Sequence, residues 1–108
     1  MIGHYLMFNR DCSEALEVYS KAFGAEIVEK QTYGDMPPNP DFPIAEEDKN
    51  LVLHARIIID GAEIMCADSA SRYESGSNMY ISVMAADMDA VKKAWDILKA
   101  GGQTYMEL

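Results

Sequence analysis

Two polar side chains lie close together in the most strand-like stretch of the sequence and could contact a ligand. His54 and Arg56 share one face of the strand predicted for residues 51–59. A pocket-facing imidazole could bind an anionic group or orient a ligand, and the alternative is a structural hydrogen bond across the sheet. A buried Arg56 would need a carboxylate partner or a bound anion. If Arg56 faces a pocket it would favour acidic substrates, and if it faces outward it is an ordinary solvated residue.

The two cysteines give no sign of a disulfide framework. Cys12 and Cys66 form no Cys-x-x-Cys pair and fall in predicted ordered elements. Because no N-terminal signal segment is recognisable, we expect reduced thiols in a cytoplasmic protein. The sequence also contains no Ser/His/Asp arrangement, no glycine-rich phosphate loop and no cluster of zinc ligands. No such motif therefore identifies a reaction.

Length and charge exclude several classes of partner. The chain has 108 residues, with nine Lys and Arg against eighteen Asp and Glu, for a net charge of −9. This length supports one small domain. Nucleic acids and anionic membrane surfaces are disfavoured because the basic residues are scarce and scattered. No apolar run approaches the length of about 20 residues that a membrane-spanning helix needs.

The first two thirds of the chain predict one helix among several strands. Alternating apolar residues predict strands over residues 4–9, 25–33, 51–59 and 62–67. The helix is expected to begin at Asp11, with Glu14 completing a capping box, and to end at Gly24. The pair Asp60-Gly61 predicts a hairpin turn. Residues 34–50 contain all four prolines and predict a long loop.

The start of this pattern recurs near the end of the chain. After a polar linker over 68–77, residues 78–85 predict a strand, and a second helix is expected from Asp87 to Gly101-Gly102. Tyr19 and Trp95 hold matching positions in the two helices and are expected to be core residues. We interpret this as an internal duplication with a first βαβββ unit over 1–68 and an incomplete second unit over 78–108.

The ordered set of motifs resembles the vicinal oxygen chelate superfamily, also called glyoxalase/bleomycin-resistance/dioxygenase, and most closely its PhnB-like branch. The residues that carry the resemblance are Tyr5-Leu6-Met7-Phe8-Asn9, Glu14-Ala15-Leu16, Tyr19, Phe23-Gly24, Leu53-His54-Ala55, Asp60-Gly61, Ile81-Ser82-Val83 and the helix end Leu98-Lys99-Ala100-Gly101-Gly102. The resemblance implies an α+β fold in which paired βαβββ units form a cupped mixed sheet around a pocket. Both helices would pack on one side of that sheet, and the second unit would be truncated.

The same resemblance implies where a divalent metal ion could lie. Metal-binding members of the superfamily use His and Glu side chains on strands, and His4 occupies the first-strand ligand position. The second-unit position falls on Asn78, and the last glutamate would lie beyond Leu108. Asparagine is a poor replacement for imidazole at a transition metal, so His4 could instead be hydrogen-bonded or partly solvated. The expected ligand pocket comprises His54, Arg56 and Asn78.

Three interpretations of function remain open at this point. The protein could be a metal-dependent isomerase, lyase or oxygenase acting on a small oxygen-rich molecule, or a metal-free protein that sequesters a small molecule, as bleomycin-resistance relatives do. The sequence could also be a shortened version of a longer protein. An incomplete second unit would leave strand edges and apolar surface uncovered. We therefore expect a homodimer, with strands exchanged between its chains as one form.

Overall fold

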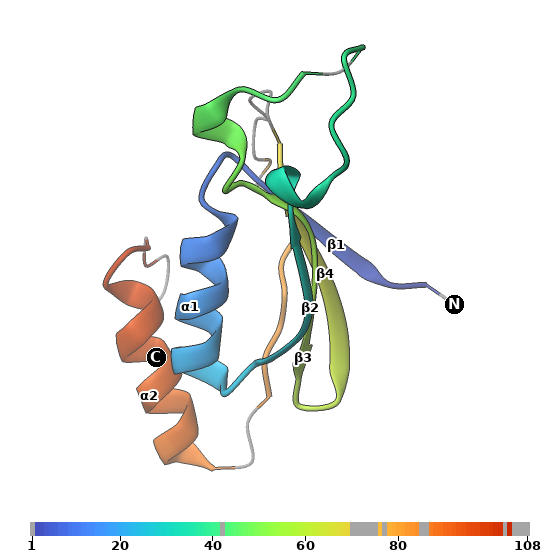
Figure 1. Ribbon diagram of the computed structural model, residues 1–108. Coiled ribbons are helices and arrows are strands. Elements are labelled where there is room, and N and C mark those ends of the chain that lie inside the picture. Colours follow the sequence, from blue (N-terminus) through green and yellow to red (C-terminus); the bar gives the residue numbers. More distant parts are fainter. Residues whose placement is uncertain are drawn as a thin grey trace.

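The protein folds into one mixed β-sheet with two helices on the same side of it (Figure 1). The computed structural model describes residues 2–41, 43–69, 76, 78–84, 87–102 and 104. In chain order the elements are β1 (His4–Phe8), α1 (Cys12–Phe23), β2 (Glu26–Thr32), the short 3₁₀ turns η1 (Tyr33–Asp35) and η2 (Glu46–Asp48), β3 (Val52–Ile59), β4 (Ala62–Asp68) and α2 (Met88–Lys99). The expected α+β fold is confirmed.

The sheet has the strand order β1-β4-β3-β2. β1 pairs in parallel with β4, and the other two pairings are antiparallel. The predicted turn between β3 and β4 is confirmed, since Asp60 and Gly61 have positive φ angles of 49° and 81°. Positive φ at both central residues matches the right-handed twist of a tight hairpin. This hairpin fixes the register of the two central strands.

The core lies between α1 and the face of the sheet that this helix covers. Helical spacing brings Cys12 and Leu16 onto one side of α1, where they are 0% and 1% exposed. They pack against strand residues that are also buried, namely Val52, Ala55, Ile57, Ile64 and Cys66. Gly24 ends the helix in the left-handed conformation, with φ of 66°, as the sequence predicted.

The start of α1 is capped differently from the prediction. Asp11 is the N-cap residue, but its side chain makes no capping hydrogen bond, so the predicted capping box with Glu14 is wrong. Asp68 instead accepts from the backbone N–H of Cys12 through Oδ1 at 2.9 Å, and from that of Val52 through Oδ2 at 2.8 Å. Asp68 is 2% exposed and ends β4 rather than starting the linker. A carboxylate remote in sequence thus joins α1, β3 and β4.

The second helix begins as predicted but lacks the strand expected before it. Asp87 accepts from the backbone N–H of Ala90 at 2.8 Å, which confirms it as the N-cap. α2 lies against α1 (Figure 1). Residues 78–84, predicted as a strand, form none, because no described strand pairs with their backbone. Ala85 and most of the predicted final strand over 103–108 lie outside the described residues.

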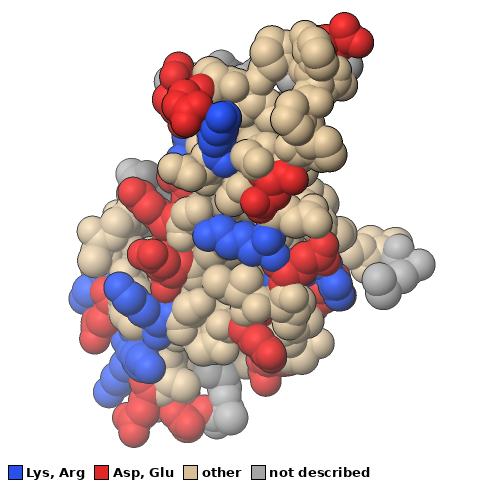
Figure 2. All heavy atoms as spheres, viewed as in Figure 1, with Lys and Arg blue, Asp and Glu red and all other residues tan. Residues whose placement is uncertain are grey.

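The long loop projects beyond one end of the sheet (Figure 1). It leaves β2 through η1 and returns to β3 through η2, where Asp48 pairs with Arg10 from the β1–α1 connection. Figure 2 shows acidic and basic side chains intermixed over the body of the molecule, and mainly uncharged ones on the projecting loop. Both helices in the described ranges are too short and polar to traverse a lipid bilayer.

Candidate ligand-binding face of the sheet

Strand alternation divides the sheet into a covered face, which packs against α1, and an open face on the other side. On β1, Leu6 and Phe8 pack against the core, so they belong to the covered face. Tyr5 and Met7 point the opposite way and are 46% and 45% exposed. Residues paired across neighbouring strands share a face, so the register assigns the side chains of the other strands.

His54 and Tyr5 form a hydrogen-bonded pair on the open face. Tyr5 Oη lies 3.1 Å from His54 Nδ1, and the two ring centroids are 5.9 Å apart. Burial, with smaller contributions from Cys66, Cys12 and Tyr33, raises the pKa of the Tyr5 phenol above 10.0, so this group is protonated at neutral pH. It can donate to Nδ1 of a neutral imidazole, which then carries its own hydrogen on Nε2. The pair would then offer a ligand one N–H donor.

Arg56 lies on the same face between two glutamates. Its Nε donates to Oε1 of Glu63 at 2.6 Å, and its Nη1 donates to Oε2 of Glu29 at 3.3 Å. The hydrogen bond from Arg56 lowers the pKa of Glu63 below 4.5, and those carboxylates raise the pKa of Arg56. The sequence left open whether Arg56 meets a ligand or solvent, and the structure places it on the open face with carboxylate partners.

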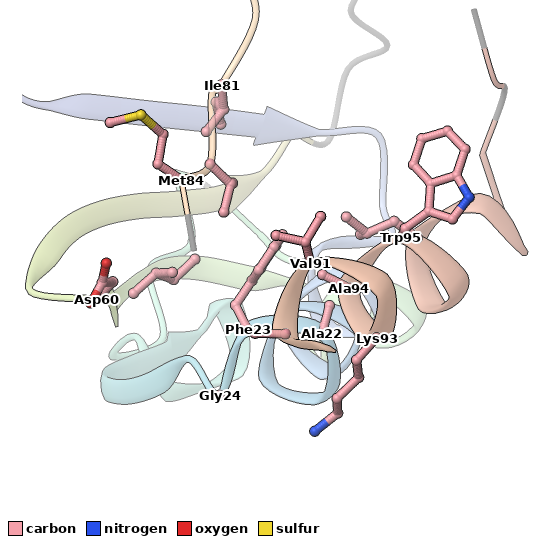
Figure 3. A pocket seen from close by; sticks show the side chains of 14 residues that line it. Ala22, Phe23, Gly24, Asp60, Ile81, Met84, Val91, Lys93, Ala94 and Trp95 are labelled. Carbon is pink, nitrogen blue, oxygen red and sulfur yellow. The ribbon is translucent and has the colours of Figure 1, made fainter. Parts of the chain in front are cut away.

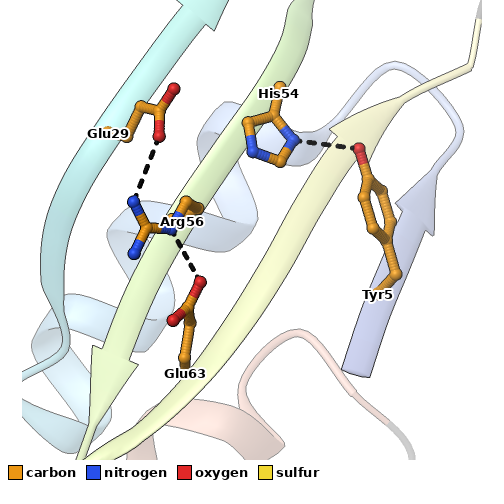
Figure 4. Close-up of polar contacts among 5 residues, drawn as sticks. All are labelled: Tyr5, Glu29, His54, Arg56 and Glu63. Carbon is orange, nitrogen blue, oxygen red and sulfur yellow. Dashed lines mark hydrogen bonds and ion pairs between the residues drawn. The ribbon is translucent and has the colours of Figure 1, made fainter. Parts of the chain in front are cut away.

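Together these five side chains form a polar row that crosses the whole sheet (Figure 4). Its members are Tyr5 on β1, Glu63 on β4, His54 and Arg56 on β3, and Glu29 on β2. The charged members are only partly buried, with Arg56, Glu29 and Glu63 side chains 39%, 38% and 35% exposed. The polar row is therefore accessible from the side that the helices leave uncovered.

His4 lies apart from this row. In the register of β1 it pairs with Ile64, and it shares the covered face with Leu6. It lines a cavity of about 460 Å³ together with apolar side chains from α1, including Tyr19 and Phe23. The two histidines of the sequence thus face opposite sides of the sheet and are not brought together.

Asn78, the remaining predicted pocket residue, lies in the irregular segment before α2. It is exposed and is not among the residues that line the cavities described here. The structure therefore brings together His54 and Arg56 of the predicted site, and leaves His4 and Asn78 elsewhere. The roles assigned to all four residues stay predictions.

A larger cavity of about 780 Å³ lies beside the two helices (Figure 3). Phe23 and Val91 point into it from α1 and α2, and Met84 approaches from the irregular segment. Among the described residues of its lining, the charged side chains are those of Asp60 and Lys93. Trp95 of α2 lines this cavity and is partly buried, whereas Tyr19 packs against the core as expected. The cavity is therefore an apolar space distinct from the polar row.

The family resemblance implies a metal ion, but the donors around His4 do not fit one. A divalent transition metal needs several N, O or S donors converging on one point. His4 is exposed, and the cavity that it lines is bordered mainly by apolar side chains such as Leu6, Phe23 and Ile64. Within the described ranges, no three His, Cys, Asp or Glu side chains are grouped so that they could hold a metal ion.

Both cysteines are free and buried, in agreement with the expectation of reduced thiols. Cys12 and Cys66 are each 0% exposed within the core. The neighbouring Cys66 thiol and burial raise the pKa of Cys12 well above its ordinary range. The Cys12 thiol is therefore kept protonated and is a poor nucleophile, and both cysteines belong to the core rather than to the polar row.

Sequence reasoning missed three members of the polar row: Tyr5, Glu29 and Glu63. The face of Tyr5 could have been inferred from the sequence, because alternation along β1 places its side chain opposite to that of His4. Glu63 could have been placed from the Asp60-Gly61 hairpin, whose register brings it within reach of Arg56. Glu29 carried no such signal, because an irregularity between Ile27 and Glu29 shifts the register of β2.

Comparison with known proteins gives a consistent result. The family model for the Glyoxalase/Bleomycin resistance protein/Dioxygenase superfamily matches residues 1–108. Protein YjdN of Escherichia coli is 28% identical over 120 residues, an alignment that covers 97% of this chain and 76% of YjdN. Among solved structures, protein PA1353 from Pseudomonas aeruginosa is 27% identical with a TM-score of 0.82, covering 100% of this chain and 78% of that one.

Two further solved structures have the same fold. The PhnB protein from Bacillus cereus is 25% identical with a TM-score of 0.79, and the match covers 99% of this chain and 79% of that one. FosX, a fosfomycin resistance protein from Listeria monocytogenes, is 15% identical with a TM-score of 0.59. The match covers 93% of this chain and 68% of the FosX chain. The chain therefore belongs to the glyoxalase/bleomycin resistance protein/dioxygenase superfamily and falls in its PhnB-like branch.

Proposed function

We propose that the protein binds a small molecule on the open face of its sheet, with the Tyr5–His54 pair as the central polar contact. The observation that carries the proposal is the 3.1 Å hydrogen bond between Tyr5 Oη and His54 Nδ1 on a face left uncovered by both helices. Such a bond fixes the imidazole ring and leaves its second nitrogen for a ligand. Met7 and Tyr5 add partly exposed apolar surface beside it.

Metal-free binding is the interpretation that the described donors support best. His4 lines a cavity on the covered face and Asn78 lines neither cavity, so these two positions of the ligand set expected from the resemblance do not converge on one cavity. Binding through protein groups alone needs only a shaped surface and a few placed polar atoms.

A metal-dependent enzyme acting on a small oxygen-rich molecule is the second candidate. It is favoured by the FosX neighbour, whose structure is described as complexed with Mn(II) and 1S,2S-dihydroxypropylphosphonic acid. In this alternative His4 is the one predicted ligand, and further donors would come from outside the described residues or from a second chain. A divalent ion would act there as a Lewis acid on the substrate oxygens.

Metal analysis and a binding screen on three proteins separate these candidates. We would measure the metal content of protein purified without chelator, and screen uncharged fragments by their effect on the backbone N–H signals of β1 and β3, which all three proteins retain. Wild type and His4→Ala should both bind fragments on the open face, whereas His54→Ala should lose that binding at least tenfold. Stoichiometric metal that disappears in His4→Ala would overturn the metal-free proposal and support the enzyme.

We further propose that the functional form is a homodimer, located in the cytoplasm. The support for a dimer is the exposed apolar segment before α2, in which Met79, Tyr80 and Met84 are 86%, 79% and 90% exposed. Light scattering at micromolar concentration should give twice the mass of 12.0 kDa. A stable monomer would contradict the dimer. The cytoplasmic location and the division into units 1–68 and 78–108 stay predictions.

A further inference from the structure

We propose that Glu29 and Glu63 determine which ligands the open face accepts. By holding Arg56 between them, they make the face selective for uncharged molecules with an oxygen acceptor and against anions such as phosphate or carboxylates. This inference rests on the proposed function, since it assigns a ligand class to the same face. It reverses the expectation that a pocket-facing Arg56 would favour acidic substrates.

The first step is the geometry of the guanidinium group. Arginine binds a carboxylate or phosphate bidentately through one of two edges, formed by Nε with Nη2 or by Nη1 with Nη2. In this protein Nε donates to Glu63 at 2.6 Å and Nη1 donates to Glu29 at 3.3 Å. Each edge therefore already has one donor directed at a glutamate. An incoming anion would have to displace a carboxylate to obtain a bidentate contact.

The second step is the local charge. One guanidinium between two carboxylates leaves the group with a net negative charge. Register places Glu26 opposite Ile58, which in turn pairs with Glu63, so a third carboxylate belongs to the same face. The lowered pKa of Glu63 keeps it ionised at neutral pH. An anion that approaches Arg56 is therefore repelled by the groups that surround it.

The third step is the hydrogen bond that remains available. Tyr5 is protonated at neutral pH and can donate to Nδ1 of His54, which leaves an Nε2–H donor on the ring. A neutral N–H donor is matched by a carbonyl, amide or hydroxyl oxygen. Met65 pairs with Tyr5 on one neighbouring strand and with Arg56 on the other, so it belongs to the same face, where it offers a polarisable apolar contact. The resulting surface suits an uncharged, partly apolar molecule.

The test is a titration with inorganic phosphate, observed through the side-chain N–H signal of Arg56. Wild type should show weak binding or none. Glu29→Gln/Glu63→Gln should bind phosphate at least tenfold more tightly, because the competing acceptors of Arg56 become neutral and bind it more weakly, and the two negative charges that repel the anion are gone. The matched control is Glu14→Gln/Glu17→Gln, which removes the same charge from exposed positions on α1. It should leave phosphate binding unchanged.

One result would overturn the inference: phosphate binding by the double variant that is no tighter than binding by wild type. If the double variant fails to fold, Glu29→Gln alone removes the longer of the two contacts and should still give a smaller gain. A parallel titration of wild type with N-methylacetamide, observed at His54, tests the open face as a binding site. If the double variant binds phosphate more tightly but wild type shows no response to N-methylacetamide, the role of the glutamates is supported and the proposed function is contradicted.

Discussion

The two faces of the sheet are built from the same four strands, yet they differ in almost every physical respect. On the covered face, Ala55 and Ile57 of β3 are both 0% exposed and pack under α1. On the open face, His54 and Arg56 of the same strand remain partly accessible and are hydrogen-bonded to neighbouring strands. Successive side chains of a strand point to opposite sides, so one segment serves stability and binding separately.

Charged side chains also differ between the core side and the open face in how deeply they are buried. Asp68 is the charged side chain that the structure buries most deeply among those described, and both of its oxygens accept backbone hydrogen bonds. The carboxylates of the polar row instead pair with a guanidinium while more than a third of each side chain stays exposed. Buried polar groups must be fully satisfied, whereas exposed ones can exchange partners with a ligand or with water. The comparison predicts large stability effects on one face and small ones on the other.

Removal of the buried carboxylate should have the largest effect. Asp68→Ala leaves the N–H groups of Cys12 and Val52 without their acceptor, and each lost charge-assisted bond is worth about 2 kcal/mol, so we expect about 4 kcal/mol of destabilisation. Urea unfolding measures the change. Asp87→Ala, which removes an exposed N-cap, is the matched control and should lower stability by only about 1 kcal/mol. Equal losses for the two variants would contradict the role given to Asp68.

A pair of apolar truncations compares the two faces directly. Leu16→Ala opens a void under the covered face, where Leu16 is 1% exposed, and should destabilise the protein by about 3 kcal/mol. Met7→Ala removes a side chain of the open face that is 45% exposed, and the change should stay within about 0.5 kcal/mol. Both are read from denaturant midpoints. A loss in Met7→Ala comparable to that in Leu16→Ala would show that the open face is covered by something else in solution.

The ion pairs of the polar row should be visible as pH dependence. The pKa of Glu63 is lowered in the folded protein, so its contribution to stability is present above the ordinary value of 4.5 and is lost as the pH falls through the lowered value. Arg56→Gln should raise the pKa of Glu63 toward 4.5, as measured by NMR titration of the carboxyl group. Arg10→Gln removes an arginine that pairs with Asp48 and should leave Glu63 unchanged. An unshifted Glu63 in Arg56→Gln would rule out the pairing.

Tyr5→Phe, like Met7→Ala, should change stability very little. The phenol is 46% exposed, so loss of its hydroxyl should alter unfolding by no more than about 0.5 kcal/mol. The ¹⁵N signals of His54 should nevertheless show less of the form protonated at Nε2, because Nδ1 loses its donor. Tyr19→Phe on α1 is the control, and it should leave the His54 signals unaltered. An unchanged His54 in Tyr5→Phe would mean that the hydrogen bond does not orient the ring.

The elements of the fold could be predicted from local patterns, and so could part of the site. Alternation and the Asp60-Gly61 turn located β3 and β4, and helical spacing with Gly24 located α1. Sequence also identified His54 and Arg56 as residues of one face. It did not show that His4 lies on the opposite face, because the face on which a side chain lies is known only once its strand is paired with neighbouring strands. Nor could it foresee that residues 78–84 would form no strand, because strand formation requires a pairing partner as well as a suitable pattern.

By itself, the sequence determined the family, the α+β architecture and the alternation that divides polar from apolar side chains. These follow from short-range periodicity and from an ordered set of motifs, which need no knowledge of distant contacts. Only the tertiary structure decided that Asp68 caps α1, that His4 and His54 face opposite sides, and that Arg56 lies between Glu29 and Glu63. Each of these depends on strand order and register, which arise from pairing between segments far apart in the chain.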